Sequence, residues 1–167
     1  MNFIKWPKIP RLENEIFHIS EKIDGTNACI VITDEGDVGA QSRTRLITPE
    51  DDNYGFANWV YENHHQLFED LGPGHHFGEW WGQGIQRGYD LKEKRFSLFN
   101  PTKQSSICSN VPMIKSEAHK FLHESIQDCV ERLQRHGSFA ASGYMRPEGL
   151  VIYGEQSKAY WKVIIDK

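Results

Sequence analysis

Cysteine is scarce in this sequence, and the three cysteines lie far apart. Cys29, Cys108 and Cys129 form no CxxC pair, and none has a histidine partner at a recognisable metal-ligand spacing. This pattern excludes a zinc ribbon or a disulfide framework as the basis of the fold, and it disfavours a thiol nucleophile. Because reduced thiols are typical of the cytosol, we expect a cytoplasmic protein.

Long apolar segments are also absent. No stretch approaches the roughly 20 apolar residues that span a bilayer, and the N-terminal segment MNFIKWPKIPRLENE lacks the apolar core of a signal peptide. We therefore expect a soluble chain with no membrane contact. A length of 167 residues suits one domain, and no repeat or low-complexity linker divides it. We expect a single domain over residues 1–167, without an appended C-terminal domain. We also expect the protein to be a monomer.

The chain has no excess of positive charge. Its 19 Lys and Arg residues are outnumbered by 23 Asp and Glu residues, which gives a net charge of -4. A protein dedicated to tight, non-specific binding of nucleic acid is normally basic, so this class is disfavoured. A local basic site remains compatible with the composition.

Turn residues divide the chain into short strands and two helices. Apolar residues at three- and four-residue intervals predict helices over residues 49–71 and 116–136. Segments rich in β-branched and aromatic residues predict strands at 15–20, 28–33, 38–41, 75–81, 95–99, 149–153 and 160–165. Many strands with two helices indicate the α+β class.

One lysine stands where a predicted strand enters a turn. In ISEKIDGTNACIVI, apolar runs lie on both sides of DGTN, which is strong turn chemistry. Taken alone, Lys22 is most simply a solvated loop charge. Other strand ends also carry charges that folding does not require, namely Arg43 in QSRTR, Glu79 in FGEWWGQGIQRG, Glu148 in MRPEGLVIY and Lys162 in AYWKVII.

The order of these segments resembles that of the covalent nucleotidyltransferase superfamily of polynucleotide ligases and capping enzymes, and most closely its RNA ligase 2-like branch. EKIDGTN resembles motif I, which implies that Lys22 is the nucleophile that becomes bound to AMP. SRT resembles motif Ia, which implies that Arg43 contacts the nucleotide or the reacting RNA ends. WKV resembles motif V, which implies that Lys162 binds the α-phosphate.

Three further motifs complete the implied site. FGEWWGQGIQ is similar to motif III, whose glutamate, here Glu79, binds the ribose. RFSLFN resembles motif IIIa, in which an aromatic ring, here Phe99, stacks on adenine. PEGLVIY is similar to motif IV, which implies that Glu148 acts on the metal or the phosphate and that Val151 packs against the base. The resemblance also assigns nucleotide binding to three residues around the lysine: Glu21, Ile23 and Asn27.

The sequence departs from the family pattern at two positions. The usual aspartate after the stacking aromatic is Asn100, which removes a formal charge from that edge of the pocket. Motif V normally has two lysines two residues apart, whereas Lys162 has no lysine at either of these distances. Lys158 and Arg43 are the possible substitutes for the missing phosphate-binding charge.

The chemistry of adenylate transfer explains these residue types independently of the resemblance. A lysine side chain is almost entirely protonated at pH 7, so a nucleophilic lysine needs nearby positive charge or burial to favour its neutral form. Lys162 and a divalent cation would supply that charge and would also stabilise the phosphates. Phosphate and carboxylate oxygens suit Mg²⁺ or Mn²⁺, and Glu148 is the carboxylate that we expect to reach this ion.

Several residues have competing interpretations. Phe96 could replace Phe99 as the stacking ring, but the two are three apart on a strand and therefore face opposite sides, so only one can face the nucleotide. Trp80 and Trp81 are expected to pack in the core rather than to touch nucleic acid. His119 and His123 are four apart on the predicted second helix and could share a zinc ion, but a solvated helix face is favoured because no further ligand is evident.

The resemblance therefore implies a nucleotidyltransferase domain in which antiparallel sheets, flanked by helices, enclose ATP. The implied function is ATP-dependent joining of RNA 5'-phosphate and 3'-hydroxyl ends, through lysyl-AMP and RNA-adenylate intermediates. Two alternatives stay open at this point. One is a DNA ligase or a GTP-using capping enzyme with the same chemistry, and the other is a non-catalytic module that binds nucleotide or RNA.

Overall fold

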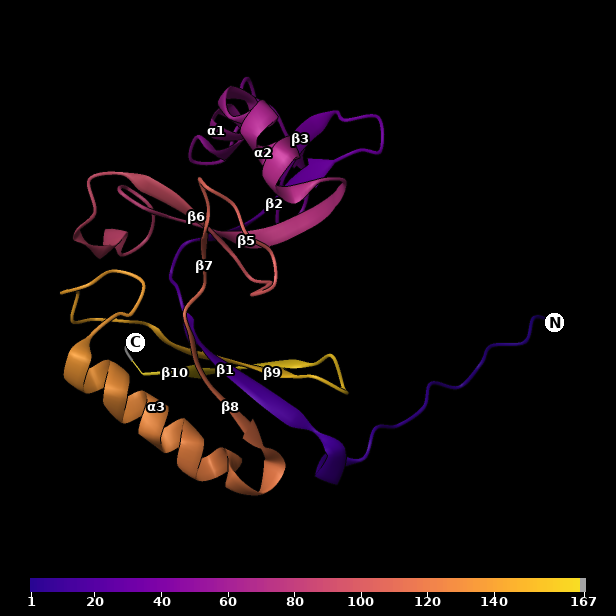
Figure 1. Cartoon of the computed structure of the whole chain (residues 1–167), viewed down its shortest axis with the longest axis vertical. Coiled ribbons are helices and arrows are strands. Elements are labelled where there is room, and N and C mark those ends of the chain that lie inside the picture. The colour runs from indigo at the N-terminus through magenta and orange to yellow at the C-terminus, as the bar shows by residue number, and fades with distance from the viewer. Residues whose placement is uncertain (166–167) are drawn as a thin grey trace.

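Two β-sheets form the body of the protein, and helices cover the outer face of each (Figure 1). The computed structural model describes residues 1–165. The strand order is β10-β9-β1-β8 in one sheet and β4-β3-β2-β5-β6-β7 in the other. The strands are β1 (Ile16–Lys22), β2 (Thr26–Ile32), β3 (Val38–Ser42), β4 (Leu46–Ile47), β5 (Gly74–Gly82), β6 (Lys94–Leu98), β7 (Ser109–Asn110), β8 (Met113–Ala118), β9 (Gly149–Gly154) and β10 (Tyr160–Ile164).

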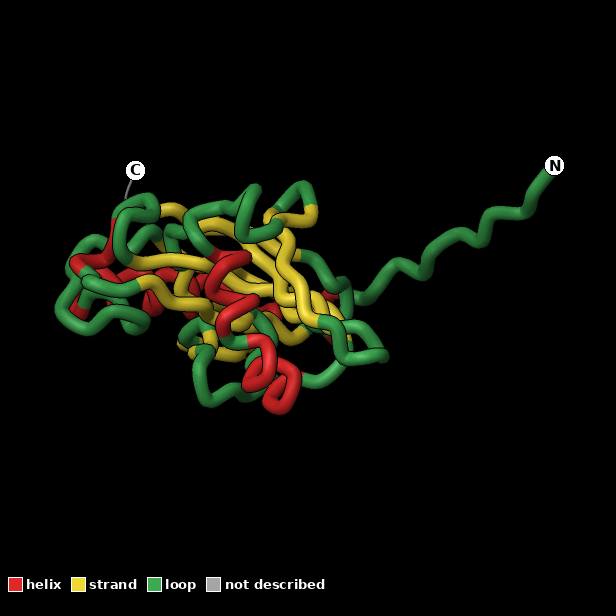
Figure 2. Tube along the Cα trace, turned by 90° about the horizontal axis from the view of Figure 1, so that it is seen from above, coloured by secondary structure: helices red, strands yellow, loops and turns green. Residues whose placement is uncertain are grey.

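The helices lie on opposite sides of the molecule. In Figure 1, α1 and α2 lie over the six-stranded sheet, and α3 runs along the four-stranded sheet. Residues 1–11 have no regular structure and extend away from the body (Figure 2). None of the described helices is long and apolar enough to cross a membrane. The helices are α1 (Phe56–Glu62), α2 (His64–Leu71) and α3 (Leu122–His136), with 3-10 turns η1 (Leu12–Asn14), η2 (Gly88–Asp90) and η3 (His119–Phe121).

Each sheet packs only one of its faces against helices. Phe17 and Ile19 of β1 are buried in a core that also contains Leu133 of α3. Ile30 of β2 belongs to a second core, which contains Phe56 of α1. Because side chains alternate along a strand, the residues between these core positions point the other way. We call the faces that the two sheets turn toward each other the inner faces (Figure 1).

A third apolar cluster joins the two sheets at one end. Ile23 follows β1 and packs with Trp81 of β5, Tyr89 of η2 and Ala141, and all four are buried. This end is where the chain leaves the four-stranded sheet and enters the six-stranded sheet, between Lys22 and Thr26. The cluster therefore fixes the two sheets relative to each other at the segment that carries the lysine.

The predicted strands are all present, with bounds shifted by at most a few residues. The sequence did not predict the short strands β4 and β7, or β8. Strand pairing is antiparallel, as expected, except that β6 and β7 pair in parallel. The α+β class is thus confirmed, and Trp80 and Trp81 are both buried as predicted.

Both predicted helices begin too early. The helix predicted over 49–71 starts only at Phe56, because the Asp52 carboxylate accepts hydrogen bonds from the Ala57 and Asn58 N–H groups and holds the preceding residues in a turn. Its second half is a separate helix, α2. The helix predicted over 116–136 starts at Leu122, because Ser116 pairs with His18 in the sheet.

The two phenylalanines of β6 and its end occupy different environments. Phe96 is buried and contacts Phe56 and Trp59, with ring centroids 5.1 and 6.1 Å apart. Phe99 follows the strand on the other face and is 44% exposed. Only Phe99 is therefore available to a ligand.

Replacing these two rings by alanine should separate their roles. Phe96→Ala should lower the free energy of unfolding by about 3 to 5 kcal/mol, because it empties a space between the sheet and α1. Phe99→Ala should lower it by less than about 1 kcal/mol, since nearly half of the residue is exposed and it lies outside the core. Urea denaturation of both variants measures the difference, and equal losses would contradict the assignment.

Candidate functional site

The crossing from β1 to β2 is fixed by an ion pair and a buried phenol. The Asp24 carboxylate accepts a hydrogen bond from Arg87 Nε at 2.7 Å, and Arg87 also donates to the Arg146 carbonyl at 2.8 Å. The Asp24 N–H donates to the Tyr89 hydroxyl at 2.7 Å. The turn after Lys22 is therefore tied both to the loop after β5 and to the loop before β9.

Gly25 allows this crossing to pass close to β5. A Cβ atom at this position would lie 2.4 Å from the Trp80 carbonyl oxygen and 2.7 Å from Trp81 Cβ. Contacts this short do not occur between real side chains and a backbone, so only glycine fits here. The KIDG turn is thus pressed against the strand that carries Glu79.

Lys22, at the end of β1, forms an ion pair with Glu148, which immediately precedes the neighbouring central strand β9. Lys22 Nζ lies 2.8 Å from Glu148 Oε2, and the two side chains are only 25% and 16% exposed. Lys22 ends β1 opposite Gly149, the first residue of β9, so the register of these strands brings the pair together. Two residues 126 positions apart are thereby joined.

Glu79 faces this pair from the other sheet. Its Oε1 accepts a hydrogen bond from the Gly25 N–H at 3.1 Å, and its Oε2 accepts one from Asn27 Nδ2 at 3.0 Å. Burial raises the pKa of Glu79 to about 7, against the opposing effect of the Lys22 charge and of these two hydrogen bonds. A glutamate at this position is therefore close to half protonated at neutral pH.

Glu21 has a different role from Lys22, although the two are adjacent. Its side chain is fully buried on the helix-facing side of β1, where Oε2 accepts hydrogen bonds from the Phe139 and Ala140 N–H groups at 2.8 and 3.0 Å. Oε1 has no hydrogen-bond partner among the described residues, and burial raises the pKa of this carboxyl. Because this face is opposite to that of Lys22, only the backbone of Glu21 can take part in the predicted nucleotide contact.

The remaining basic residues of the prediction lie at the sheet edges. Lys162 of β10 pairs with Val151 of β9, and Val151 pairs with Ser20 of β1, so Lys162 and Val151 lie on the inner face with Lys22 two residues further along. Arg43 is exposed in the bend that follows β3, beside the Ala28–Ser42 pair. Neither cation forms an ion pair with any other residue within 1–165, and both are exposed and accessible to an anionic ligand.

The departure at Asn100 has a local structural explanation. Its side-chain oxygen accepts hydrogen bonds from the Thr102 N–H and hydroxyl at 2.9 and 2.8 Å, which caps the turn after β6. This turn begins immediately after Phe99. Asn100 therefore stabilises the turn that directly follows the predicted stacking residue.

The described residues form neither a zinc site at His119 and His123 nor a reactive thiol. No group of three or more His, Cys, Asp or Glu side chains is arranged to hold a metal ion. The His119–His123 pair is divided between η3 and α3 and therefore does not share one helix face. Burial raises the pKa of Cys29 and Cys108 to about 11, so both thiols stay protonated at neutral pH.

The sequence did not point to Arg87 or Tyr89, which hold the crossing. Both lie in the glycine-rich loop after β5, where Tyr89 has a φ of 56°. In the sequence, the two residues stand beside Gly84 and Gly88 in a segment that shows no helix or strand pattern. Nothing in the spacing indicates that Arg87 reaches a residue 63 positions earlier.

The predicted site residues all fall within one match to a known family. The family model described as RNA ligase matches residues 15–164. The chain belongs to the RNA ligase family. Comparison with curated protein sequences gives no significant match.

Solved RNA ligase structures share this fold. A mutant RNA ligase of Naegleria gruberi in its apo form matches with a TM-score of 0.66 and 19% identity, over 92% of this chain and 50% of that chain. A second Naegleria gruberi mutant, with ATP and Mn, matches with a TM-score of 0.61 and 17% identity over the same shares. An archaeal ATP-dependent RNA ligase gives 0.59 and 16%, over 95% and 48%. The chain thus spans about half the length of these structures.

The titration of Glu79 can be measured through stability. Its pKa is near 4.5 when unfolded and about 7 when folded, so between these values the folded state holds a proton that the unfolded state has lost. The free energy of unfolding should therefore fall as the pH rises from about 5 to 8, by roughly 3 kcal/mol relative to Glu79→Gln, which does not titrate. Urea denaturation of both proteins across this range gives the difference. A difference that is constant with pH, or that changes in the opposite direction, contradicts the assignment.

Proposed function

We propose that this RNA ligase family member is an ATP-dependent RNA ligase of the RNA ligase 2-like branch, with Lys22 as its covalent nucleophile. The observation that carries the proposal is the Lys22–Glu148 pair, at 2.8 Å, on an inner face opposite the anchored Glu79 carboxylate. An amine at the end of β1, an acceptor for its proton just before β9 and an acceptor for ribose hydroxyls within β5 are then brought together. The ATP and Mn found with a similar Naegleria ligase support ATP as the nucleotide and a divalent cation.

In the first step, Lys22 Nζ would attack the α-phosphorus of ATP. The N–P bond forms as the bond to the bridging oxygen breaks, and pyrophosphate leaves with the electron pair. A lysine attacks only as the neutral amine, so Nζ must lose its proton before the bond to phosphorus forms. Glu148 Oε2 lies at hydrogen-bond distance and is placed to receive that proton.

Other inner-face residues would hold the nucleotide. Lys162 is exposed beside Val151 and would bind the α-phosphate, whose charge grows during the attack. Glu79 would accept hydrogen bonds from the ribose, and Phe99 and Val151 would contact the two faces of adenine. Asn27 and the backbone of Glu21 and Ile23 would line the same pocket.

The residues present fit a hard divalent cation. Mg²⁺ and Mn²⁺ are normally bound through one or two carboxylates, with phosphate oxygens and water completing the coordination. Glu148 is a single, partly exposed carboxylate beside the predicted phosphate position, and it meets that requirement. When bound, the ion would supply positive charge to the phosphates.

The later steps would join two RNA ends. An oxygen of the RNA 5'-phosphate attacks the lysyl-AMP phosphorus, the N–P bond breaks, and its electron pair returns to Lys22 Nζ. The RNA 3'-hydroxyl then attacks the 5'-phosphate, AMP leaves, and a phosphodiester remains. Arg43 is exposed at the end of β3 and would contact the RNA ends.

Substitution of Lys22 tests the nucleophile. Lys22→Ala and Lys22→Arg should both abolish transfer of label from α-labelled ATP to the protein, because arginine stays charged and does not attack. Lys162→Ala should slow labelling without removing the bond-forming atom. Lys120→Ala, at the far side of the molecule before α3, serves as the control and should label like wild type. Full labelling of Lys22→Ala would sink the proposal, and labelling by GTP alone would indicate the capping-enzyme alternative.

Substitution of Phe99 tests the adenine pocket. Phe99→Ala should raise the ATP concentration for half-maximal labelling by about fivefold or more, since loss of a stacking ring costs about 1 to 3 kcal/mol. Phe68→Ala removes a similarly exposed ring from α2 and should have no effect. An unchanged ATP requirement in Phe99→Ala would show that another group stacks on the base.

A further inference from the structure

Aromatic rings on the inner face of the six-stranded sheet extend beyond the proposed ATP site. On β5, Glu79 is followed on the same face by Phe77 and then by His75, each two residues further from the crossing. Phe77 is 54% exposed and His75 is also exposed, so neither ring is needed by the core. Their ring planes are 19° apart, with centroids 6.2 Å apart, and form a nearly continuous surface.

Phe99 continues this surface onto the next strand. Its N–H donates to the Phe77 carbonyl at 3.0 Å, which places the two residues opposite each other on β5 and the end of β6. On the other side of Phe77, Cys29 of β2 pairs with Phe77 and with Gln41 of β3. The inner face therefore presents three accessible rings with a glutamine at one side, and the amide of Gln41 can hydrogen-bond a base edge.

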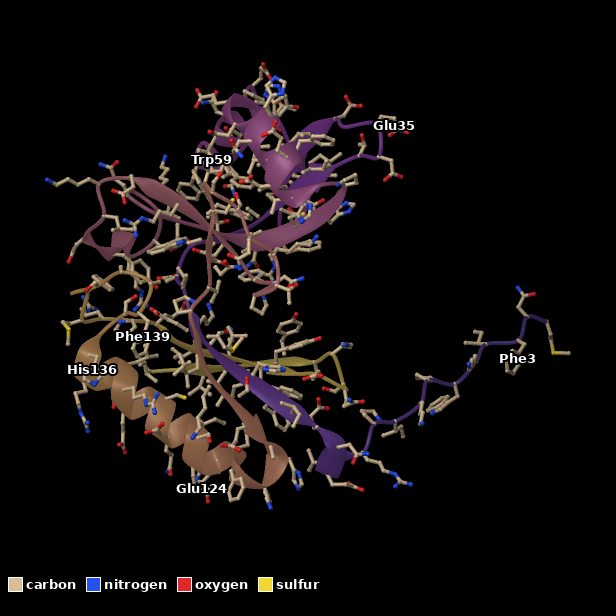
Figure 3. The ribbon with its side chains drawn as sticks, in the orientation of Figure 1. Phe3, Glu35, Trp59, Glu124, His136 and Phe139 are labelled. Carbon is tan, nitrogen blue, oxygen red and sulfur yellow. The ribbon has the colours of Figure 1, made fainter. Side chains whose placement is uncertain are left out.

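The four-stranded sheet carries a second aromatic row on its own inner face. His18 lies four residues from Lys22 on the same face of β1, about 13 Å away along the strand. Its ring lies 6.2 Å from that of Tyr153, which lies 4.7 Å from that of Tyr160, a residue that is 67% exposed. Phe77 and His75 thus lie progressively further from the crossing along β5, whereas the second row crosses β1, β9 and β10 at one level, four residues from Lys22. Figure 3 shows side chains from both sheets directed into the space between them.

We propose that His75 and Phe77, which border the adenine-stacking Phe99, bind unpaired bases of the RNA that is joined, with Phe77 as the main stacking residue. Rings at positions i and i+2 of one strand, with a third ring on the neighbouring strand, suit stacking of successive bases on an open sheet face. The occupant is single-stranded RNA for two reasons. The surface is continuous with the proposed nucleotide site, and exposed aromatic rings stack on bases that are not paired. The inference rests on the proposed RNA ligase function.

Binding of a fluorescein-labelled oligouridylate, followed by fluorescence anisotropy without ATP, tests the surface. Phe77→Ala should weaken binding by about fivefold or more, whereas Phe77→Trp, which keeps a stacking ring, should bind like wild type. Phe121→Ala, which removes an exposed ring before α3, is the matched control and should also bind like wild type.

A second probe separates stacking from other effects. An abasic RNA of the same length keeps the phosphates but lacks bases, so wild type and Phe77→Ala should bind it equally. Equal affinity of wild type and Phe77→Ala for oligouridylate would overturn the inference, as would an equal loss on the abasic probe. These binding results are independent of catalysis: labelling of wild type by ATP tests the proposed function, and that function survives if only the binding difference is missing. Conversely, a base-dependent loss in Phe77→Ala supports the RNA surface even if no lysyl-AMP forms.

Discussion

The short crossing between β1 and β2 is the constraint on which the rest of the site depends. Three residues, Ile23, Asp24 and Gly25, carry the chain from one sheet to the other. Each is held differently: Ile23 by burial, Asp24 by Arg87 and Tyr89, and Gly25 by close contact with β5. Because Lys22 precedes the crossing and Asn27 follows it, these contacts set the position of the predicted nucleophile against the opposite sheet.

Three glutamates near this crossing have different roles because they differ in burial and in hydrogen-bond partners. Glu21 is buried among backbone N–H groups and fixes the loop after α3. Glu79 is buried but hydrogen-bonded, and it titrates near neutral pH. Glu148 forms an ion pair with Lys22 beside the ends of β1 and β9. Since each sheet packs its outer face, where Glu21 lies, against helices, the inner faces remain available to Glu79, to the Lys22–Glu148 pair and to ligands.

The parts of the fold that depend on local sequence were predictable. Alternation and turn residues located β1, β2, β5, β9 and β10, and the motif order placed Lys22, Glu79 and Glu148 before their distances were known. The helix starts were not predictable, because they depend on contacts made outside each helix. Asp52 accepts a hydrogen bond from the first turn of α1, and Ser116 pairs with β1 as part of strand β8. The Arg87–Asp24 pair depends on tertiary contact alone. The roles of Arg43, Lys162, Val151 and Phe99 in the reaction stay predictions, although the structure leaves each of them partly or fully accessible.

The covalent intermediate is the central claim, and its position on the chain can be measured directly. Wild-type protein incubated with ATP and magnesium, then denatured, digested and analysed by mass spectrometry, should carry one AMP on the peptide that contains Lys22. Fragmentation should place the added mass on the Lys22 side chain. The modification should be lost when the labelled protein is incubated with pyrophosphate before denaturation, because pyrophosphate reverses the first step. AMP on another lysine, or a Lys22 peptide that stays unmodified at saturating ATP, would contradict the account.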